Sequence, residues 1–351
     1  MYTRYGGTIM PEVVLAAMAD ASKRFVNLFE LQDQVGRAIA RLTQNEAAMV
    51  SCGAASGLLL CTAAAIAGMD EEKAARLPDS GGLRNQFIMR YCERGTEADP
   101  VIRAAGGRIV HVGPADRSAT PDEIFAAINE QTAGIVLVAF ESEVHAEAAA
   151  VIAGARARGI PVIIDGACAL PPRKNLWHYT RDLGAAALVT SGGKAIHGPQ
   201  STGLVLGRSW MIEACKFHAS PNLRIGRGMK VGKEEFAGIY TALKHFLNVD
   251  EVAAAAREQK ILAVIADRLK GLPGARISLA GGPKLQIRLD PTVVSLDSEQ
   301  IAAALHSGDP SILLSGRGGK IAICANQLQD GEGETVADRL RQVIGGGGTG
   351  Q

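Results

Sequence analysis

The chain of 351 residues is 47% hydrophobic, which is enough for a sizeable buried core, and its length suggests about two domains. Its 37 Lys and Arg balance 36 Asp and Glu, and this net charge of +1 argues against nucleic acid or an anionic membrane as a partner. Aromatic residues make up only 4%, too few for base-stacking platforms.

The six cysteines show no C-x-x-C pair and no regular spacing, so we expect reduced, mostly buried thiols and no metal site. Residues 1–5 lack the apolar core of a signal peptide. No apolar run approaches the length of a membrane span. These features predict a cytoplasmic protein.

The N-terminal part is predicted to be helical at 11–23 and 33–42, where apolar residues recur at helical spacing. Residues 51–57, Ser-Cys-Gly-Ala-Ala-Ser-Gly, then join a short apolar segment to a helical run at 58–67. Small residues there let backbone N–H groups approach a phosphate at a helix N-terminus, although such turns are also common as simple packing. The polar segment 68–78 is predicted to link elements.

From residue 86 the pattern alternates between strands and helices. Strands are predicted at 87–89, 108–112, 134–140 and 160–164, with helices around 100–105, 124–130 and 146–158. Thr120, Pro121 and Glu123 form a strong helix start. The alternation predicts an α/β fold with a mostly parallel sheet, whose ligands bind at the carboxyl ends of the strands.

Lys194 lies in a glycine-rich turn, 191–203, after an apolar run at 185–189 that is predicted to be a buried strand. A lysine among small apolar residues costs free energy unless its charge is removed or used, and a desolvated amine is a nucleophile for aldehydes. Alternatively, Lys194 is a solvated turn residue.

Asp165 directly follows the predicted strand at 160–164. A carboxylate there can hold the pyridine nitrogen of pyridoxal phosphate (PLP) protonated, which makes the ring an electron sink. An Asp at a strand end is also commonly a cap or turn former. The order of phosphate turn, Asp165 and Lys194 within one α/β pattern favours a PLP site.

The C-terminal part is predicted to be a separate α+β domain. Long helices are expected at 234–247 and 249–269, with the domain boundary near Phe246. Strands at 276–279, 284–289, 312–314 and 320–324 and helices at 298–306 and 334–343 follow. We therefore expect a large domain at 1–246, a small domain at 247–344 and a disordered glycine-rich tail at 345–351.

Residues 191–194, 198–203 and 225–235 resemble the selenocysteine synthase-like branch of fold-type I PLP enzymes, which contains L-seryl-tRNA(Sec) selenium transferase and D-glucosaminate-6-phosphate ammonia-lyase. Residues 2–8 and 170–177 look more like the ammonia-lyase side. The resemblance covers nearly the whole chain. It implies a sheet of the seven-stranded type, a smaller C-terminal α+β domain and a homodimer or higher homo-oligomer.

The resemblance also implies roles for particular residues. Lys194 would hold the cofactor covalently and act in catalysis with His197. Asp165 would hold the pyridine nitrogen, and the phosphate would bind at Gly53, Ala54, Ala55, Ser56 and Ser191. An anionic amino substrate would bind at Arg4, Tyr5, Gln200, Arg227 and Lys230. Alternatively, Arg227, Lys230 and Lys233 form a solvated basic turn.

At three places the chain departs from the family pattern or the role of a residue is not decided. Residues 90–99 stand where we expect a His-containing motif, so the group that stacks on the cofactor ring is not identified. His145 is either an acid, base or cofactor contact, or a solvated loop residue. Ser315 stands close to where relatives have an arginine, with Arg317 two residues later, and the contact to a substrate carboxylate stays open.

The expected reaction is an α,β-elimination in which Lys194 removes the Cα proton and a Cβ hydroxyl leaves, giving a 2-keto acid and ammonia. The resemblance favours a sugar-acid phosphate such as D-glucosaminate 6-phosphate. The alternatives are a selenium transferase acting on seryl-tRNA, another PLP enzyme such as a racemase or aldolase, and a cofactor-binding relative without activity. The neutral charge balance argues against the tRNA partner.

Overall fold

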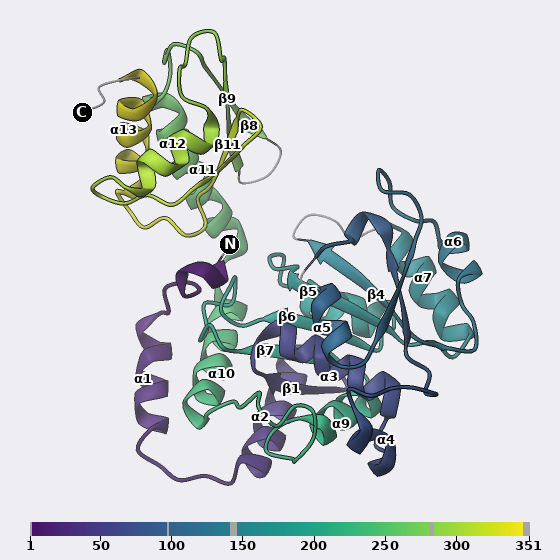
Figure 1. The fold of residues 1–351 in the computed structure, drawn as a ribbon. Helices are drawn as coiled ribbons and strands as arrows, with labels where there is room; N and C mark the ends of the chain where they lie inside the picture. Colours follow the sequence, from purple (N-terminus) through teal and green to yellow (C-terminus); the bar gives the residue numbers. More distant parts are fainter. Residues whose placement is uncertain (1, 97, 141–145, 281–283, 347–351) are drawn as a thin grey trace. The chain divides into compact units, whose positions relative to one another are not determined.

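The computed structural model describes residues 2–96, 98–140, 146–280 and 284–346, which belong to two compact units, Met1–Asn248 and Val249–Gln351 (Figure 1). The sequence placed this boundary near Phe246. Within the described ranges, no helix is long and apolar enough to cross a bilayer.

The first unit combines a seven-stranded sheet with helices on both faces. Its helices are α1 Glu12–Ala21, α2 Leu28–Leu42, α3 Gly53–Ala67, α4 Glu71–Arg76, α5 Ala98–Ala104, α6 Pro121–Ala126, α7 Ala146–Ala157, α8 Asn175–Trp177, α9 Ser209–His218 and α10 Lys233–Asn248. Its strands are β1 Ala47–Ser51, β2 Gln86–Arg90, β3 Arg108–Val112, β4 Thr132–Phe140, β5 Val162–Cys168, β6 Ala187–Ser191 and β7 Gly203–Gly207. Short turns of other helix types are η1 Tyr2–Tyr5, η2 Tyr91–Glu93 and η3 His178–Asp182.

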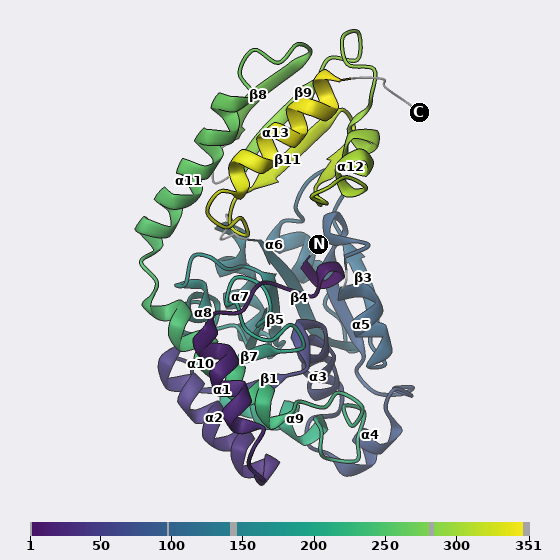
Figure 2. The same ribbon diagram turned by 90° about the vertical axis from the view of Figure 1, so that its left-hand side faces the viewer.

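The strands of this sheet follow the order β1-β7-β6-β5-β4-β2-β3. Strand β7 runs antiparallel to both of its neighbours, β1 and β6, and the other pairs are parallel. The mostly parallel seven-stranded sheet predicted from the sequence is therefore confirmed, and so is its cover of helices. Figure 2 shows α1, α2 and α10 grouped beside the β1 and β7 end of the sheet.

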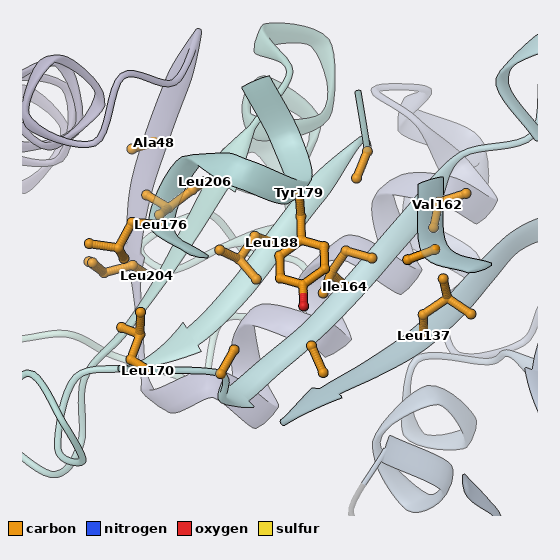
Figure 3. Close-up of a cluster of buried hydrophobic side chains, with 14 of the residues drawn as sticks. Ala48, Leu137, Val162, Ile164, Leu170, Leu176, Tyr179, Leu188, Leu204 and Leu206 are labelled. Carbon is orange, nitrogen blue, oxygen red and sulfur yellow. The ribbon is translucent and has the colours of Figure 1, made fainter. Parts of the chain in front are cut away.

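Neighbouring residues of each central strand point to opposite faces of the sheet, as the pleat requires. Ile164 of β5 and Leu188 of β6 belong to one buried cluster, together with Tyr179 (Figure 3). Ile163 and Val189 belong to a second cluster, which includes residues of α3, α5 and α9. Because both faces are covered, these strands are apolar until their carboxyl ends, which is why the sequence showed them as continuous apolar runs.

Several boundaries differ from the sequence prediction because local caps extend or create helices. Helix α2 begins at Leu28, five residues before the predicted start, since the Asn27 side chain accepts hydrogen bonds from the N–H groups of Phe29 and Glu30. The predicted linker 68–78 contains α4, which Asp70 caps in the same way. The predicted capping box at Thr120 and Glu123 is confirmed, but α6 ends at Ala126 and not at Glu130.

The second unit contains a four-stranded antiparallel sheet and three helices. The helices are α11 Glu251–Arg268, α12 Ser298–His306 and α13 Glu332–Gly345, and the strands β8 Ala275–Ala280, β9 Lys284–Leu289, β10 Ser315–Arg317 and β11 Lys320–Cys324 follow the order β10-β11-β9-β8. The strand predicted at 312–314 is wrong. Gly318 and Gly319, both at positive φ, form a tight hairpin turn that pairs Arg317 with Lys320 and places the strand at β10 instead. The tail predicted at 345–351 begins too early, because α13 includes Gly345, and residues 347–351 lie outside the described residues.

The expectation of mostly buried thiols is wrong, because only Cys61 and Cys215 are buried. Their sulfur atoms lie 3.7 Å apart where α3 packs against α9. Of the other four cysteines, Cys52 and Cys168 are half-buried, and Cys92 and Cys324 are exposed. Each of these four lies at a strand end or in a turn, where packing is incomplete.

Candidate active site

The residues predicted to bind a cofactor come together at one edge of the large sheet. Ser51 ends β1 and Ser191 ends β6, and both pair with Gly203, the first residue of β7. Asp165 of β5 pairs with Val189, two residues before Ser191. The carboxyl ends of these parallel strands therefore bring the phosphate turn, Asp165 and the Lys194 turn to the same edge.

The phosphate turn is the N-terminus of the 15-residue helix α3. Gly53 has φ +82°, and a side chain added there would meet nothing within 4 Å. Cys52, at the N-cap, makes no side-chain hydrogen bond to the helix, and the first turn carries no acidic residue. The N–H groups of the first turn, which include those of Ala54, Ala55 and Ser56, have no side-chain cap. They can bind an anion such as a phosphate group.

Two hydroxyl groups fix the shape of this turn. The Ser51 Oγ donates a hydrogen bond to the Gly53 carbonyl over 2.9 Å, and the Ser56 Oγ donates to the Cys52 carbonyl over 2.5 Å. Burial raises the pKa of the Cys52 thiol and nearby Glu235 raises it further, whereas the hydrogen bond with Ser56 lowers it. The neutral thiol of Cys52 therefore adds no negative charge against a phosphate.

Gly203 permits the close contact between β7 and the phosphate turn. A Cβ atom at this position would lie 2.5 Å from the Gly53 carbonyl carbon and 2.8 Å from the Ala54 nitrogen. We expect Gly203→Ala to displace the turn, lower the free energy of unfolding by about 1–3 kcal/mol and weaken cofactor binding. Urea denaturation and PLP titration measure both effects. The control is Gly81→Ala, where the nearest atom to the added carbon is a side-chain oxygen at 3.4 Å; equal loss in both variants would contradict the prediction.

Asp165 is half-buried between β4 and β6, where it pairs with Val138 and Val189. Its Oδ1 atom accepts a hydrogen bond from the Ala167 N–H over 3.2 Å. The sequence predicted that the strand ends at Ile164, but β5 continues to Cys168 because Phe140 of β4 offers Cys168 a further partner. The carboxylate is therefore held on a rigid strand, as a group that must hold a ring nitrogen requires.

Lys194 is half-buried in the turn after β6. Its Nζ atom donates to the Sγ atom of Cys168 over 3.1 Å. The turn is tightly folded, since a Cβ atom at Gly193 would lie 2.5 Å from the Gln200 Cα. The Lys194 carbonyl accepts a hydrogen bond from the Thr8 hydroxyl over 3.2 Å. The Lys194 side chain is therefore partly enclosed by the fold and has a polar partner.

The N-terminal segment 3–9 packs against the same turn. The His197 Nδ1 lies 3.1 Å from the Ile9 carbonyl, and the Gln200 Nε2 donates to the Thr3 carbonyl over 2.8 Å. His197 adopts φ 56°, a left-handed conformation that is uncommon outside glycine. Because a carbonyl can only accept, Nδ1 carries a proton, and a neutral His197 ring leaves Nε2 unprotonated.

These bonds bring Arg4 and Tyr5 of η1 to the Lys194 turn, where both side chains are exposed. The Arg4 guanidinium lies 5.8 Å from the centre of the Tyr5 ring. The segment therefore presents a cation and an aromatic ring to solvent at the edge of the site.

Arg227 and Lys230 lie next to the phosphate turn. Both are exposed and line a cavity of about 310 Å³ whose wall also includes Ser51 and Cys52. The third predicted cation, Lys233, forms an ion pair with Glu234. Lys194 and Asp165 are not on the wall of this cavity. Arg227 and Lys230 therefore share a cavity with the phosphate turn, whereas Lys194 does not line that cavity.

Residues 90–99, His145 and Arg317 are the positions whose roles the sequence left open. Arg90 forms a buried ion pair with Glu93 and donates to the Ser118 hydroxyl over 2.9 Å. Tyr91 follows β2 and places its ring edge-on to His111, 6.0 Å between centroids. His145 lies outside the described residues. Arg317 is in β10 of the second unit.

Sequence reasoning missed Cys168 and Thr8, which both contact the Lys194 turn. Cys168 lies three residues after Asp165, and Thr8 lies in the opening segment 2–8. These positions were the only sequence signals that the two residues belong to the site.

These residues fit PLP. An amine can hold its aldehyde, a carboxylate can hold its ring nitrogen, and an uncapped helix N-terminus can hold its phosphate. The fold and site together define a PLP-dependent enzyme of fold type I. A family model described as Aminotransferase class-V matches residues 98–322, and the chain belongs to that family.

Two curated relatives match the chain over nearly its full length. It is 30% identical over 370 residues to a 5'-C-glycyluridine monooxygenase-decarboxylase of Streptomyces sp, covering 99% of this chain and 90% of that protein. It is 28% identical over 351 residues to D-glucosaminate-6-phosphate ammonia lyase of Salmonella typhimurium (strain 14028s / SGSC 2262), covering 96% of this chain and 91% of that protein. A solved structure of D-glucosaminate-6-phosphate ammonia-lyase superposes with a TM-score of 0.81 at 26% identity, covering 98% and 94% of the two chains.

Proposed function

We propose that this protein is a PLP-dependent ammonia-lyase that acts on a hydroxylated, phosphorylated amino acid such as D-glucosaminate 6-phosphate. The observation that carries the proposal is the meeting of Lys194, Asp165 and the uncapped N-terminus of α3 at one sheet edge. The similarity to an ammonia lyase over 96% of this chain supports the type of reaction.

PLP supplies an electron sink for the negative charge that develops at the substrate Cα. The Lys194 amine takes the Cα proton, and the Asp165 carboxylate keeps the ring nitrogen protonated. The N–H groups of residues 53–56, with Ser191, hold the cofactor phosphate. Loss of the Cβ hydroxyl as water, followed by hydrolysis, gives a 2-keto acid and ammonia.

The proton for the leaving hydroxyl comes from water or from His197. The bond from His197 to the Ile9 carbonyl occupies Nδ1. His197 can therefore donate from Nε2 only when its ring carries both protons. Water is the donor at a pH where the ring is neutral.

Arg227 and Lys230 bind the substrate phosphate in this proposal. We expect Arg227→Ala and Lys230→Ala each to raise KM for a phosphorylated substrate roughly 10- to 100-fold, because each loses a charge-assisted hydrogen bond. Steady-state kinetics measure the effect. The matched control is Lys233→Ala, since Glu234 already pairs with that amine. A similar rise in KM for the dephosphorylated substrate would contradict the assignment.

The Streptomyces relative motivates a second candidate, an oxygen-dependent decarboxylation of an amino acid. Both relatives' names describe an amino-acid group on a sugar-derived chain. The two reactions differ in their products. Elimination releases ammonia and a 2-keto acid without oxygen, whereas monooxygenation with decarboxylation consumes oxygen and releases carbon dioxide.

The experiment that tests the function incubates the PLP-loaded enzyme with D-glucosaminate 6-phosphate under air and under nitrogen. Ammonia and 2-keto acid in equal amounts under both atmospheres support the lyase. Carbon dioxide release that stops under nitrogen supports the second candidate. Racemised substrate without ammonia would contradict both.

We also propose that the chain forms a homodimer through its N-terminal helices. Large apolar side chains are exposed on and between α1 and α2, with Phe25 106% and Phe29 54% exposed. We expect light scattering to give twice the chain mass of 36.7 kDa. Phe25→Asp with Phe29→Asp is expected to give monomers, whereas Val252→Asp, at an exposed apolar residue of the second unit, leaves the dimer intact. A wild-type monomer would contradict the proposal.

We place the enzyme in the cytoplasm. None of its six cysteines forms a disulfide, and four of them are at least half-buried. Thiols of this kind persist in a reducing compartment.

A further inference from the structure

Cys168 lies in direct contact with the amine that we assign to the cofactor. It ends β5, three residues after Asp165, and is half-buried. The distance from its Sγ to the Lys194 Nζ is 3.1 Å. In the part of the chain that the structure describes, Cys168 contacts no second cysteine sulfur, and Cys61 and Cys215 contact each other instead.

Both members of the pair are held on ordered elements. Cys168 pairs with Phe140 of β4, and the Lys194 turn is fixed by hydrogen bonds to Thr8 and by its tight packing on Gln200. The contact is therefore set by the strands and the turn. Because both residues are half-buried, a small oxidant such as hydrogen peroxide can reach them.

We propose that Cys168 and Lys194 form a peroxide-dependent, reversible sulfenamide cross-link. Hydrogen peroxide oxidises the Cys168 thiol to a sulfenic acid, and one water leaves. The Lys194 amine then attacks that sulfur, the S–O bond breaks, an S–N bond forms and a second water leaves. The sulfur is oxidised by two electrons and the peroxide is reduced by two. Two thiol molecules reverse the reaction, giving back Cys168 and Lys194 and one disulfide.

The nearest nucleophile decides the fate of a sulfenic acid. At Cys168 that nucleophile is an amine and not a second thiol, so the product is a sulfenamide. The cross-link also consumes the lysine that binds PLP, and this consequence rests on the proposed function. In the cofactor-free chain, the cross-link would thus protect Cys168 from irreversible oxidation and prevent PLP from binding until a thiol reduces it.

The test treats the cofactor-free full chain with hydrogen peroxide and maps tryptic peptides by mass spectrometry. Trypsin cannot cleave after a modified Lys194, so we expect peptide 159–173 joined to peptide 182–208, about 2 Da below the sum of the two. Dithiothreitol should restore separate peptides and cleavage at Lys194. Recovery of Cys168 as sulfinic acid with normal cleavage after Lys194 would overturn the proposal, and so would an unmodified Cys168 while exposed Cys92 is oxidised.

Two variants and one loading control sharpen the result. Cys168→Ser keeps a polar side chain and should give no cross-link, whereas Cys92→Ser should cross-link as the wild type does. Saturation with PLP before peroxide should suppress the cross-link if Lys194 holds the cofactor. A cross-link that forms equally with and without PLP leaves the modification site standing and contradicts the proposed role of Lys194, so the two failures are distinguishable.

Discussion

Lys194→Ala is expected to abolish lysine-bound PLP and to lower kcat at least roughly 100- to 10,000-fold, the range for removal of a positioned proton-transfer group. The amine serves twice in the proposed reaction, as the group that holds the cofactor and as the base that takes the Cα proton. The measurement is ammonia release together with the visible absorption band of lysine-bound PLP.

The matched control is Lys23→Ala, because Lys23 is exposed and has no role in the proposed site. It should keep both the band and the activity. Wild-type turnover in Lys194→Ala would show that another residue performs the chemistry.

Asp165→Asn is expected to lower kcat roughly 100- to 1,000-fold, the range for loss of one electrostatic contact to developing charge. Asparagine has the same shape and can still accept the Ala167 N–H bond, so the strand should stay intact. Without the negative charge, the ring nitrogen loses its proton and the cofactor becomes a weaker electron sink. PLP should still bind Lys194.

The expected signature is therefore a loss of kcat with a preserved band of lysine-bound PLP. Asp165→Glu should recover part of the activity, because it restores the charge. If Asp165→Asn works as fast as the wild type, the carboxylate is not the partner of the ring nitrogen.

The large sheet could be predicted because its strands are buried on both faces and therefore read as apolar runs. The lengths of the strands could not be predicted, because each strand ends where its neighbour stops offering hydrogen-bond partners. The extension of β5 from Ile164 to Cys168 depends on Phe140 of β4, which no local pattern reveals. In the second unit the Gly318-Gly319 turn, and not the apolar run at 312–314, decided where β10 lies.

The candidate site divides in the same way. The chemistry of Lys194 and Asp165 could be predicted from residue type and position at strand ends. The contact between Lys194 and Cys168 joins residues 26 positions apart and arises only when β5 and β6 are paired. The bond between His197 and Ile9 spans 188 positions, and it changes what a predicted acid can donate.

Borohydride reduction shows directly whether Lys194 holds PLP. Reduction fixes the cofactor to the amine that holds it, and tryptic mapping then locates the label. We expect one phosphopyridoxyl group per chain on Lys194, within an uncleaved peptide 182–208. A label on another lysine, such as Lys230, or no label at saturating PLP would contradict it.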